Sequence, residues 1–214
     1  MSTRWGECKI FFREFRDKFE ATGSVTPSSR YLARALTQPL RGRAPGPARI
    51  LEVGPGTGSV TAEIVRQLRA DDCFHLIELN ARFVELLERR FAAEPLFQRA
   101  AGQMRLFHGA VESFAAEAPY DHIICGLPFN NFPAELAAQI LGCLFGLLTP
   151  GGSMTFFEYP CLRPFKMCFS SAAQRRRARE TAAVLDEYMA RYQRGRRRVF
   201  RNVPPATAHY LYLT

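Results

Sequence analysis

The sequence has no long uninterrupted apolar run. Its longest candidate, residues 140–148, is broken by Gly142 and Gly146, whereas a membrane-spanning helix needs about 18 apolar residues. The first 15 residues mix charged with apolar side chains, so we expect no secretory signal there. These absences predict a soluble or peripheral protein located in the cytoplasm.

Cysteine pairs with the spacing of metal sites are also missing. The six cysteines form no C-x-x-C pair, and none stands at metal-ligand spacing from a histidine. The sequence therefore predicts no metal site. Free thiols fit a reducing compartment, and we expect no disulfide framework.

Acidic residues are scarce in the last quarter of the chain. Residues 163–214 carry 12 Lys and Arg against 3 Asp and Glu, and this segment accounts for the whole net charge of +9. A one-sided basic segment favours a polyanionic partner, either nucleic acid or an anionic membrane surface. The alternative is a solvent-exposed helix face with no partner.

The 214 residues suffice for one domain with a substantial core. From residue 48, short apolar runs alternate with amphipathic helical segments, which predicts an α/β, doubly wound, mostly parallel sheet of seven strands. We expect these strands at residues 49–53, 73–78, 104–108, 122–125, 153–158, 198–203 and 209–213. We expect helices in this part at residues 60–68, 81–93, 111–116, 134–147 and 172–192.

Residues 1–47 form an N-terminal extension of two predicted helices, before the domain of residues 48–214 in what we expect to be one globular unit. The first helix, 4–22, interleaves basic residues with an apolar face, which is typical of helices lying in a lipid interface. Packing against its own domain is the alternative. The second starts with Thr26 as N-cap and Pro27 in its first turn and runs to about Leu36. The aromatic residues of the first face are Trp5, Phe12, Phe15 and Phe19.

A glycine-rich turn joins the first strand of the domain to its helix in the segment ILEVGPGTGSVTAEIV. The glycines permit a tight turn and close approach of a ligand to the backbone. The turn has neither the Lys-Ser/Thr of a P-loop nor the G-x-G-x-x-G spacing of dinucleotide sites. Glu52, two residues before the first glycine, favours a cationic ligand. The candidate binding residues of this turn are Glu52, Gly54, Pro55, Gly56, Thr57 and Gly58.

Glu78 ends the second strand, where an acid can bind both hydroxyls of a ribose. With E-x-G-x-G-x-G upstream, the pattern resembles class I S-adenosylmethionine-dependent methyltransferases. The resemblance implies S-adenosylmethionine as cofactor and S-adenosylhomocysteine as product. It also implies an adenine site beside four residues, where Glu112 takes the role of an acid that many relatives carry at the position of Ala110. These residues are Leu79, Ala110, Val111 and Glu112.

The segment GLPF, residues 126–129, follows the fourth strand, which in this fold ends beside the cofactor's methyl group. Nitrogen methyltransferases carry D/N/S-P-P-Y/F there, and ribosomal RNA adenine dimethylases carry N-L-P-Y. Gly126 removes the polar side chain, which favours an aliphatic amine over a planar adenine amine. We expect the carbonyls near Leu127 and Pro128 to position the amine, and Phe129 to contact the methylated ammonium through a cation–π interaction. Asn130 and Asn131 are candidates for a phosphate contact or for caps of the next helix.

Nearly the whole chain resembles the bacterial phospholipid N-methyltransferases, which methylate phosphatidylethanolamine towards phosphatidylcholine. The resemblance rests on GSVTPSSRYLARAL, ILEVGPGTGSVT, CGLPFNNFP and RNVPPATAHY. It implies an amino-lipid substrate, binding to an anionic membrane surface through the first helix and through Arg196, Arg197 and Arg198, and a location at the inner face of the cell membrane. We expect a monomer in solution. We also expect that positioning of the two reactants contributes more to the rate than a dedicated base does. Tyr31 and His108 are the base candidates.

Three other functions remain open. Ornithine-lipid N-methyltransferases are relatives that act on another amino lipid. An RNA adenine methyltransferase agrees with the basic C-terminal segment but not with Gly126 or with the missing substrate domain. A non-catalytic, cofactor-binding membrane adaptor would agree with the altered GLPF motif.

Overall fold

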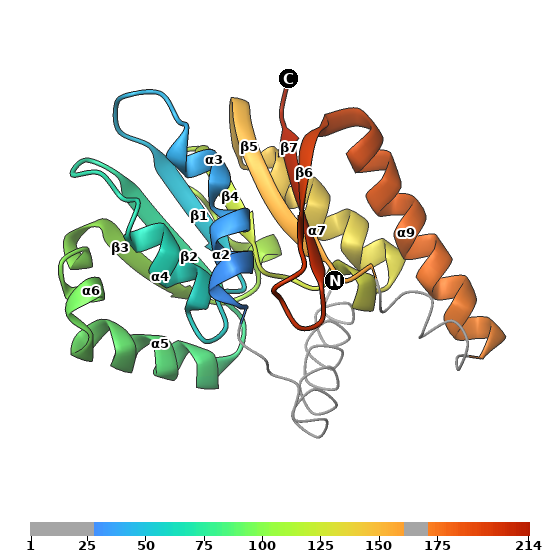
Figure 1. Ribbon diagram of the computed structural model, residues 1–214, viewed down its shortest axis with the longest axis horizontal. Coiled ribbons are helices and arrows are strands. Elements are labelled where there is room, and N and C mark those ends of the chain that lie inside the picture. Colours follow the sequence, from blue (N-terminus) through green and yellow to red (C-terminus); the bar gives the residue numbers. More distant parts are fainter. Residues whose placement is uncertain (1–27, 161–170) are drawn as a thin grey trace.

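A seven-stranded mixed sheet organises the protein in the computed structural model, which describes residues 28–160 and 171–214 (Figure 1). The strand order is β3-β2-β1-β4-β5-β7-β6. The first five strands are parallel, β7 is antiparallel to β5, and β6 is antiparallel to β7. This arrangement confirms the predicted fold class. The strands are β1 Arg49–Val53, β2 Cys73–Glu78, β3 Met104–His108, β4 Tyr120–Cys125, β5 Leu148–Glu158, β6 Gln193–Val199 and β7 Ala206–Tyr212.

Helices cover both faces of the sheet, and each face has its own buried core. On one face α2 and α4 pack over the centre of the sheet, and on the other α7 and α9 do so. None of the helices in the described part of the chain is long and apolar enough to cross a bilayer. The α-helices are α2 Arg30–Leu36, α3 Gln38–Arg41, α4 Ser59–Val65, α5 Ala81–Ala93, α6 Pro95–Gln98, α7 Ala134–Gly146 and α9 Ala172–Tyr192, and the 3₁₀ turns are η1 Ala101–Gln103, η2 Val111–Ser113 and η3 Phe129–Asn131.

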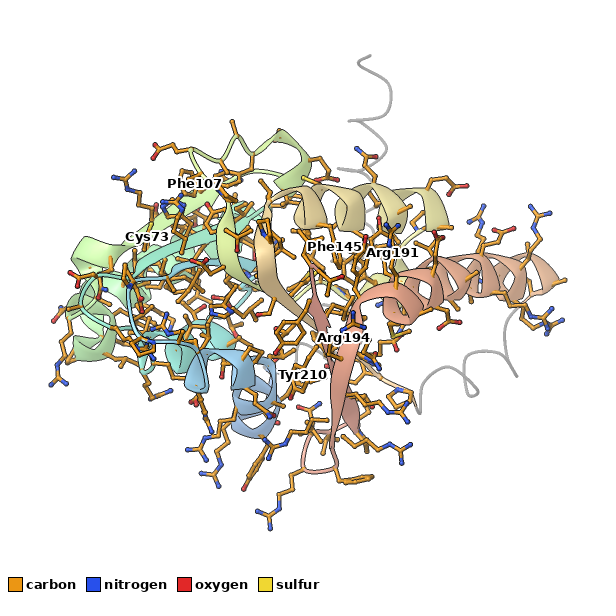
Figure 2. The ribbon with its side chains drawn as sticks, turned by 90° about the horizontal axis from the view of Figure 1, so that it is seen from above. Cys73, Phe107, Phe145, Arg191, Arg194 and Tyr210 are labelled. Carbon is orange, nitrogen blue, oxygen red and sulfur yellow. The ribbon has the colours of Figure 1, made fainter. Side chains whose placement is uncertain are left out.

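Aromatic and aliphatic side chains join the helices to the sheet and to each other. Phe145 of α7, labelled in Figure 2, lies with its ring centroid 5.1 Å from that of Tyr188 and 4.4 Å from that of Tyr192, both in α9. On the opposite face, Leu32 and Leu36 of α2 are fully buried in the core that includes β1 and α4. The described part of the N-terminal extension is therefore integral to the domain.

Several predicted boundaries were wrong. Ser29, not Thr26, caps α2, because its hydroxyl accepts a hydrogen bond from the Leu32 amide. Residues 111–116 form only the short turn η2, and β6 begins directly after α9 rather than at residue 198. The start of β6 was missed because an edge strand rich in arginine has no apolar alternation to reveal it. The predicted helix over residues 4–22, with the four aromatic residues of its apolar face, lies outside the described residues.

The sheet brings the candidate site residues to one edge. β1, β2 and β4 are parallel neighbours, so the glycine-rich turn, Glu78 and the GLPF segment all follow carboxyl ends of adjacent strands. Because β6 runs parallel to β5 across β7, the β6–β7 connection lies at this same edge, at the bottom of Figure 1. Ligands of open α/β sheets bind at such carboxyl edges.

Candidate active site

The glycine-rich turn is held against the end of β2 by Glu78. One carboxylate oxygen accepts a hydrogen bond from the Gly56 amide at 3.0 Å, and the other accepts one from the Asn80 amide at 2.9 Å. Gly54 and Gly56 have positive φ angles of 70° and 56°, which glycine adopts without strain. Burial raises the pKa of Glu78, while the backbone donors oppose this shift. Each oxygen retains a lone pair for a ligand hydroxyl.

Glu52 lies fully buried beneath this turn, with 1% of its surface exposed. Burial raises its pKa to about 8, the charge of nearby Glu78 adds to the shift, and hydrogen bonding from Thr61 opposes it. Its Oε2 atom has no hydrogen-bond partner. A buried acceptor without a donor is costly, so this position suits the positive charge that the sequence predicts for the ligand.

A narrow cavity opens beside these two acids at the ends of β1, β2 and β4. It brings together six of the residues predicted to bind the cofactor, and adds apolar walls from four further side chains. The predicted residues are Gly54, Glu78, Leu79, Ala110, Val111 and Glu112, and the others are Val53, Ile77, Leu127 and Ile140.

Thr57 and Gly58 do not line this cavity. They face α5, where the Arg90 guanidinium donates to the Thr57 carbonyl, and a Cβ atom on Gly58 would come within 2.9 Å of Leu87. They therefore anchor the turn to α5, and their contact with the ligand stays a prediction. Pro55 is buried and accepts, through its carbonyl, a hydrogen bond from the Gly58 amide.

The residues around the cavity fit S-adenosylmethionine. Glu78 supplies carboxylate acceptors for the ribose hydroxyls, the apolar walls suit an adenine ring, and Glu52 places a carboxyl oxygen without a partner beneath the turn. Within residues 28–160 and 171–214 no cluster of metal-ligating side chains occurs.

The GLPF segment closes the cavity from the β4 side. The Gly126 amide donates to the Val53 carbonyl at 2.7 Å, and a Cβ atom on Gly126 would lie 2.5 Å from the Gly54 carbonyl oxygen. Real Cβ contacts are not this short, so residue 126 has no room for a side chain. The Leu127 side chain lies over Gly54, where an added Cβ would meet it at 2.7 Å. Backbone from β1 and β4 therefore meets directly at the place where nitrogen methyltransferases carry a polar side chain.

Phe129 does not face an amine site in this structure. Its ring has no exposed surface and packs edge-to-face against Phe132 and Phe156, with centroids 6.0 and 5.7 Å away. The expected cation–π contact is corrected to a packing role. Asn130 and Asn131 lie in η3, and the N-cap residue of α7 is Pro133, so the expectation that they cap α7 was wrong.

The two base candidates lie in different parts of the fold. His108 is exposed at the end of β3, where its Nε2 atom is 3.3 Å from the Leu79 carbonyl oxygen, and β2 and β1 separate it from β4. This position corrects the expectation that His108 acts on the amine. Tyr31 lies at the start of α2 between Arg30 and Arg201, which donate to its hydroxyl at 2.9 and 3.2 Å. These two guanidiniums lower the pKa of Tyr31.

Glu158 and His209 form a buried pair that the sequence reasoning missed. The Glu158 Oε2 atom is 3.2 Å from His209 Nε2, and His209 Nδ1 is 2.8 Å from the Gln193 side-chain oxygen. The last paired residues of β4 and β5 are Ile124 and Thr155, so Leu127 and Glu158 each lie three residues farther towards the carboxyl edge. The sequence feature that could have revealed Glu158 is the single acid at the end of the apolar run MTFFE.

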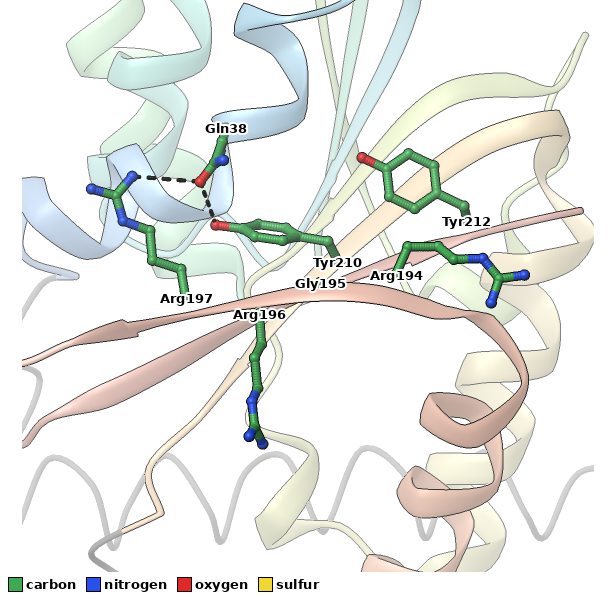
Figure 3. A pocket seen from close by; sticks show the side chains of 7 residues that line it. All are labelled: Gln38, Arg194, Gly195, Arg196, Arg197, Tyr210 and Tyr212. Atoms are coloured by element: carbon green, nitrogen blue, oxygen red, sulfur yellow. Dashed lines mark hydrogen bonds between the residues drawn. The ribbon is translucent and has the colours of Figure 1, made fainter.

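A larger, open hollow of about 680 Å³ lies between α3 and the β6–β7 hairpin (Figure 3). Arg196 and Arg197 line it, and Arg198 follows them in β6 as a third exposed base. Tyr210 and Arg197 both donate to the Gln38 side-chain oxygen, at 2.9 and 3.4 Å. This hollow is basic and lies away from the glycine-rich turn, so it is distinct from the cofactor cavity.

Comparisons with known proteins find similarity to methyltransferases. Residues 50–152 match the family model described as "Methyltransferase domain". An ornithine lipid N-methyltransferase of Singulisphaera acidiphila is 28% identical over 145 residues, which cover 67% of this chain and 73% of the relative. A ribosomal RNA small subunit methyltransferase A of Gloeobacter violaceus is 29% identical over 96 residues, or 45% of this chain and only 31% of the relative.

Solved structures share the fold at low identity. The O-methyltransferase TomG of Streptomyces achromogenes, solved in complex with S-adenosylmethionine, has a TM-score of 0.60 at 15% identity and covers 86% of this chain and 79% of its own. TrmN of Thermus thermophilus has the same TM-score at 19% identity, covering 86% of this chain and 48% of its own. The chain thus has the fold of class I S-adenosylmethionine-dependent methyltransferases, and residues 50–152 match the model of a methyltransferase domain.

Proposed function

We propose that this methyltransferase transfers methyl groups to the head-group amine of an amino lipid, either phosphatidylethanolamine with its methylated intermediates or an ornithine lipid. Gly126 carries the proposal. The space for a side chain at this position is taken by the Gly54 carbonyl, 2.5 Å from where a Cβ atom would stand. A planar adenine amine depends on a polar side chain there, whereas an aliphatic amine is a strong nucleophile once it is neutral.

The GLPF segment supplies acceptors rather than donors. Pro128 has no N–H group, and the Leu127 carbonyl already accepts one hydrogen bond, from the Phe129 amide at 3.1 Å. Carbonyls at this turn suit the N–H groups of an amine. Bound S-adenosylmethionine supplies an electrophilic methyl group, and the protein's contribution is to hold the amine in line with it and exclude water.

Glu158 is the residue that we propose to accept the proton of the lipid ammonium. It is buried at the end of β5 and paired with His209. A lipid ammonium must lose a proton before it reacts, and a buried carboxylate beside an imidazole offers a route for that proton. Glu158→Gln should lower kcat about 10- to 100-fold, and it should shift the pH–rate profile because a proton acceptor is lost. An unchanged profile would leave Glu158 with a purely structural role.

Overlap with the ornithine lipid N-methyltransferase supports the lipid class, because the match extends over 73% of that relative. The ribosomal RNA methyltransferase shares less than a third of its length. Phosphatidylethanolamine remains within the proposal because the motifs around residues 126–133 and 201–210 resemble phospholipid N-methyltransferases.

The test is mass spectrometry of lipids after incubation with S-adenosylmethionine. Purified protein is mixed separately with vesicles of phosphatidylethanolamine and of ornithine lipid, each with phosphatidylglycerol as anionic lipid. A gain of methyl groups on one amino lipid supports the proposal and selects the head group. Protein that binds the cofactor but methylates neither lipid would overturn it, and a cofactor-binding adaptor would then be the better account.

A further inference from the structure

The tip of the β6–β7 hairpin exposes two large apolar side chains. Phe200 is 75% exposed and Val203 is 76% exposed, and they are the large hydrophobic residues most open to solvent in the described chain. Exposed apolar side chains that occur singly need no explanation. Here both belong to one short connection at the carboxyl edge of the sheet, the edge that holds the cofactor cavity.

The tip is fixed in place by Asn202, which lies between the two exposed side chains in sequence and is 3% exposed. Its side-chain oxygen accepts from the Ser29 amide at 3.1 Å, and its side-chain nitrogen donates to the Pro204 carbonyl at 2.7 Å. It also hydrogen-bonds Tyr159, just beyond β5. These contacts tie the tip to the start of α2 and to the end of β5, so Phe200 and Val203 are presented on a rigid support.

Exposed guanidiniums surround this tip. Arg198 precedes it, and Arg201 lies within it. Arg30 joins them through Tyr31, whose ring lies under both Arg30 and Arg201 at 4.9 and 5.3 Å. In residues 28–160 and 171–214 none of these three arginines forms a salt bridge with a carboxylate.

We propose that the β6–β7 tip is a membrane-insertion element: Phe200 and Val203 enter the interface of an anionic bilayer, and Arg30, Arg198 and Arg201 contact the lipid phosphates. Apolar side chains flanked by bases are typical of interfacial anchors. An aliphatic valine offers nothing for stacking on a nucleic-acid base, which favours lipid over RNA. Insertion would turn the carboxyl edge towards the membrane. The choice of lipid as occupant rests on the proposed function.

Sedimentation with vesicles of phosphatidylcholine and phosphatidylglycerol tests this element without any substrate amine. The variant Phe200→Ser with Val203→Ser removes apolar surface and leaves the net charge unchanged. Its matched control, Ala70→Ser with Ala101→Ser, alters two exposed residues that precede β2 and β3 at the opposite edge. Because both sites are exposed, circular dichroism should show unchanged thermal unfolding for both variants.

We expect the tip variant to lose about tenfold or more of its partition coefficient, and the control to change it less than about twofold. Equal binding by wild type and tip variant would overturn the proposal, as would equal losses in both variants. A tip variant that keeps vesicle binding but loses binding to a single-stranded RNA oligonucleotide would assign the surface to nucleic acid instead. Failure of lipid methylation alone would contradict the proposed function but leave this binding result unaffected.

Insertion can also be observed directly. Trp5 is the one tryptophan of the chain, so Phe200→Trp combined with Trp5→Phe places a single fluorophore at the tip. Addition of the same vesicles should shift its emission to shorter wavelength, and brominated lipids should quench it. Protein that sediments with vesicles while this emission stays unchanged would show that another surface binds, and would overturn the proposal.

Discussion

The two ends of the carboxyl edge differ in how they are built. At the β1–β2 end, carboxylates and glycines meet through backbone hydrogen bonds, and the buried Glu52 Oε2 atom has no partner. At the β5–β6 end, arginines and apolar side chains face solvent, with Glu158 and His209 buried behind them. The first end has the features of a closed cofactor site, and the second has those of a surface for a large, anionic partner.

Gly126, where the two ends meet, is the most sensitive position. Gly126→Ala should lower activity about 100-fold or more, because the added Cβ displaces GLPF from the Gly54 backbone by roughly an ångström. Steady-state kinetics with vesicle substrate would measure this loss. Gly142→Ala in α7 is the control, since its Cβ would meet only the Tyr188 hydroxyl at an ordinary 3.7 Å. Equal activity in both variants would contradict the close contact.

Glu78→Gln should weaken the cofactor end alone. Both carboxylate oxygens accept backbone N–H groups, so an amide nitrogen in the side chain must face a donor. Loss of one or two such bonds costs about 1–3 kcal/mol, and we expect S-adenosylhomocysteine to bind about 10- to 100-fold more weakly by calorimetry. Glu88→Gln, exposed on α5, should leave affinity unchanged. Vesicle binding should remain at the wild-type level. A parallel loss of vesicle binding would contradict the assignment of cofactor binding and membrane binding to separate ends.

Glu52 predicts a pH dependence for stability of the ligand-free protein. Its pKa of about 8 in the folded state exceeds the ordinary 4.5, so between these values the folded state binds more protons than the unfolded state. Stability from this group is present below pH 4.5 and is lost as the pH rises towards 8. Glu52→Gln should therefore be more stable than wild type by roughly 2–4 kcal/mol at pH 8 and nearly equal to it at pH 5. Urea unfolding at both pH values measures this, and parallel curves would contradict the buried, protonated carboxyl.

Single arginines at the β6 end should have the smallest effects. Arg198→Ser should weaken binding to phosphatidylglycerol vesicles about fivefold, since each base near an anionic surface contributes about 1 kcal/mol. The difference should shrink as salt screens the interaction. Arg99→Ser removes the same charge from an exposed site just before η1. Equal effects of the two changes would mean that net charge, and not the β6 end, governs binding.

The sequence predicted the cofactor end far better than the other. Strands β1, β2 and β3 end where their apolar runs end. The spacing of Glu52, the glycines and Glu78 correctly predicted a turn after β1 and an acid at the end of β2. Such patterns can be recognised from residues that are close in sequence, without knowledge of distant contacts. The contacts of Thr57 and Gly58 with α5 were not predicted, because only the folded chain brings Leu87 and Arg90 next to them.

At the β5–β6 end the decisive contacts are remote in sequence. Glu158 meets His209 across two strands, and Asn202 meets Ser29 across 173 positions. The periodicity of apolar residues along the sequence does not indicate which distant residues form such pairs. The burial of Phe129 was missed for the same reason, since Phe156, which packs against it, lies in the later strand β5.

The most direct test of the amino-lipid assignment is a competition in one reaction. Wild-type protein and limiting labelled S-adenosylmethionine would meet equal amounts of amino-lipid vesicles and of an unmodified ribosomal RNA fragment, with the label counted in each fraction. We predict that the label enters lipid, and that mass spectrometry finds it on a head-group amine. Label found in adenine of the RNA, with the lipids unmodified, would contradict the account.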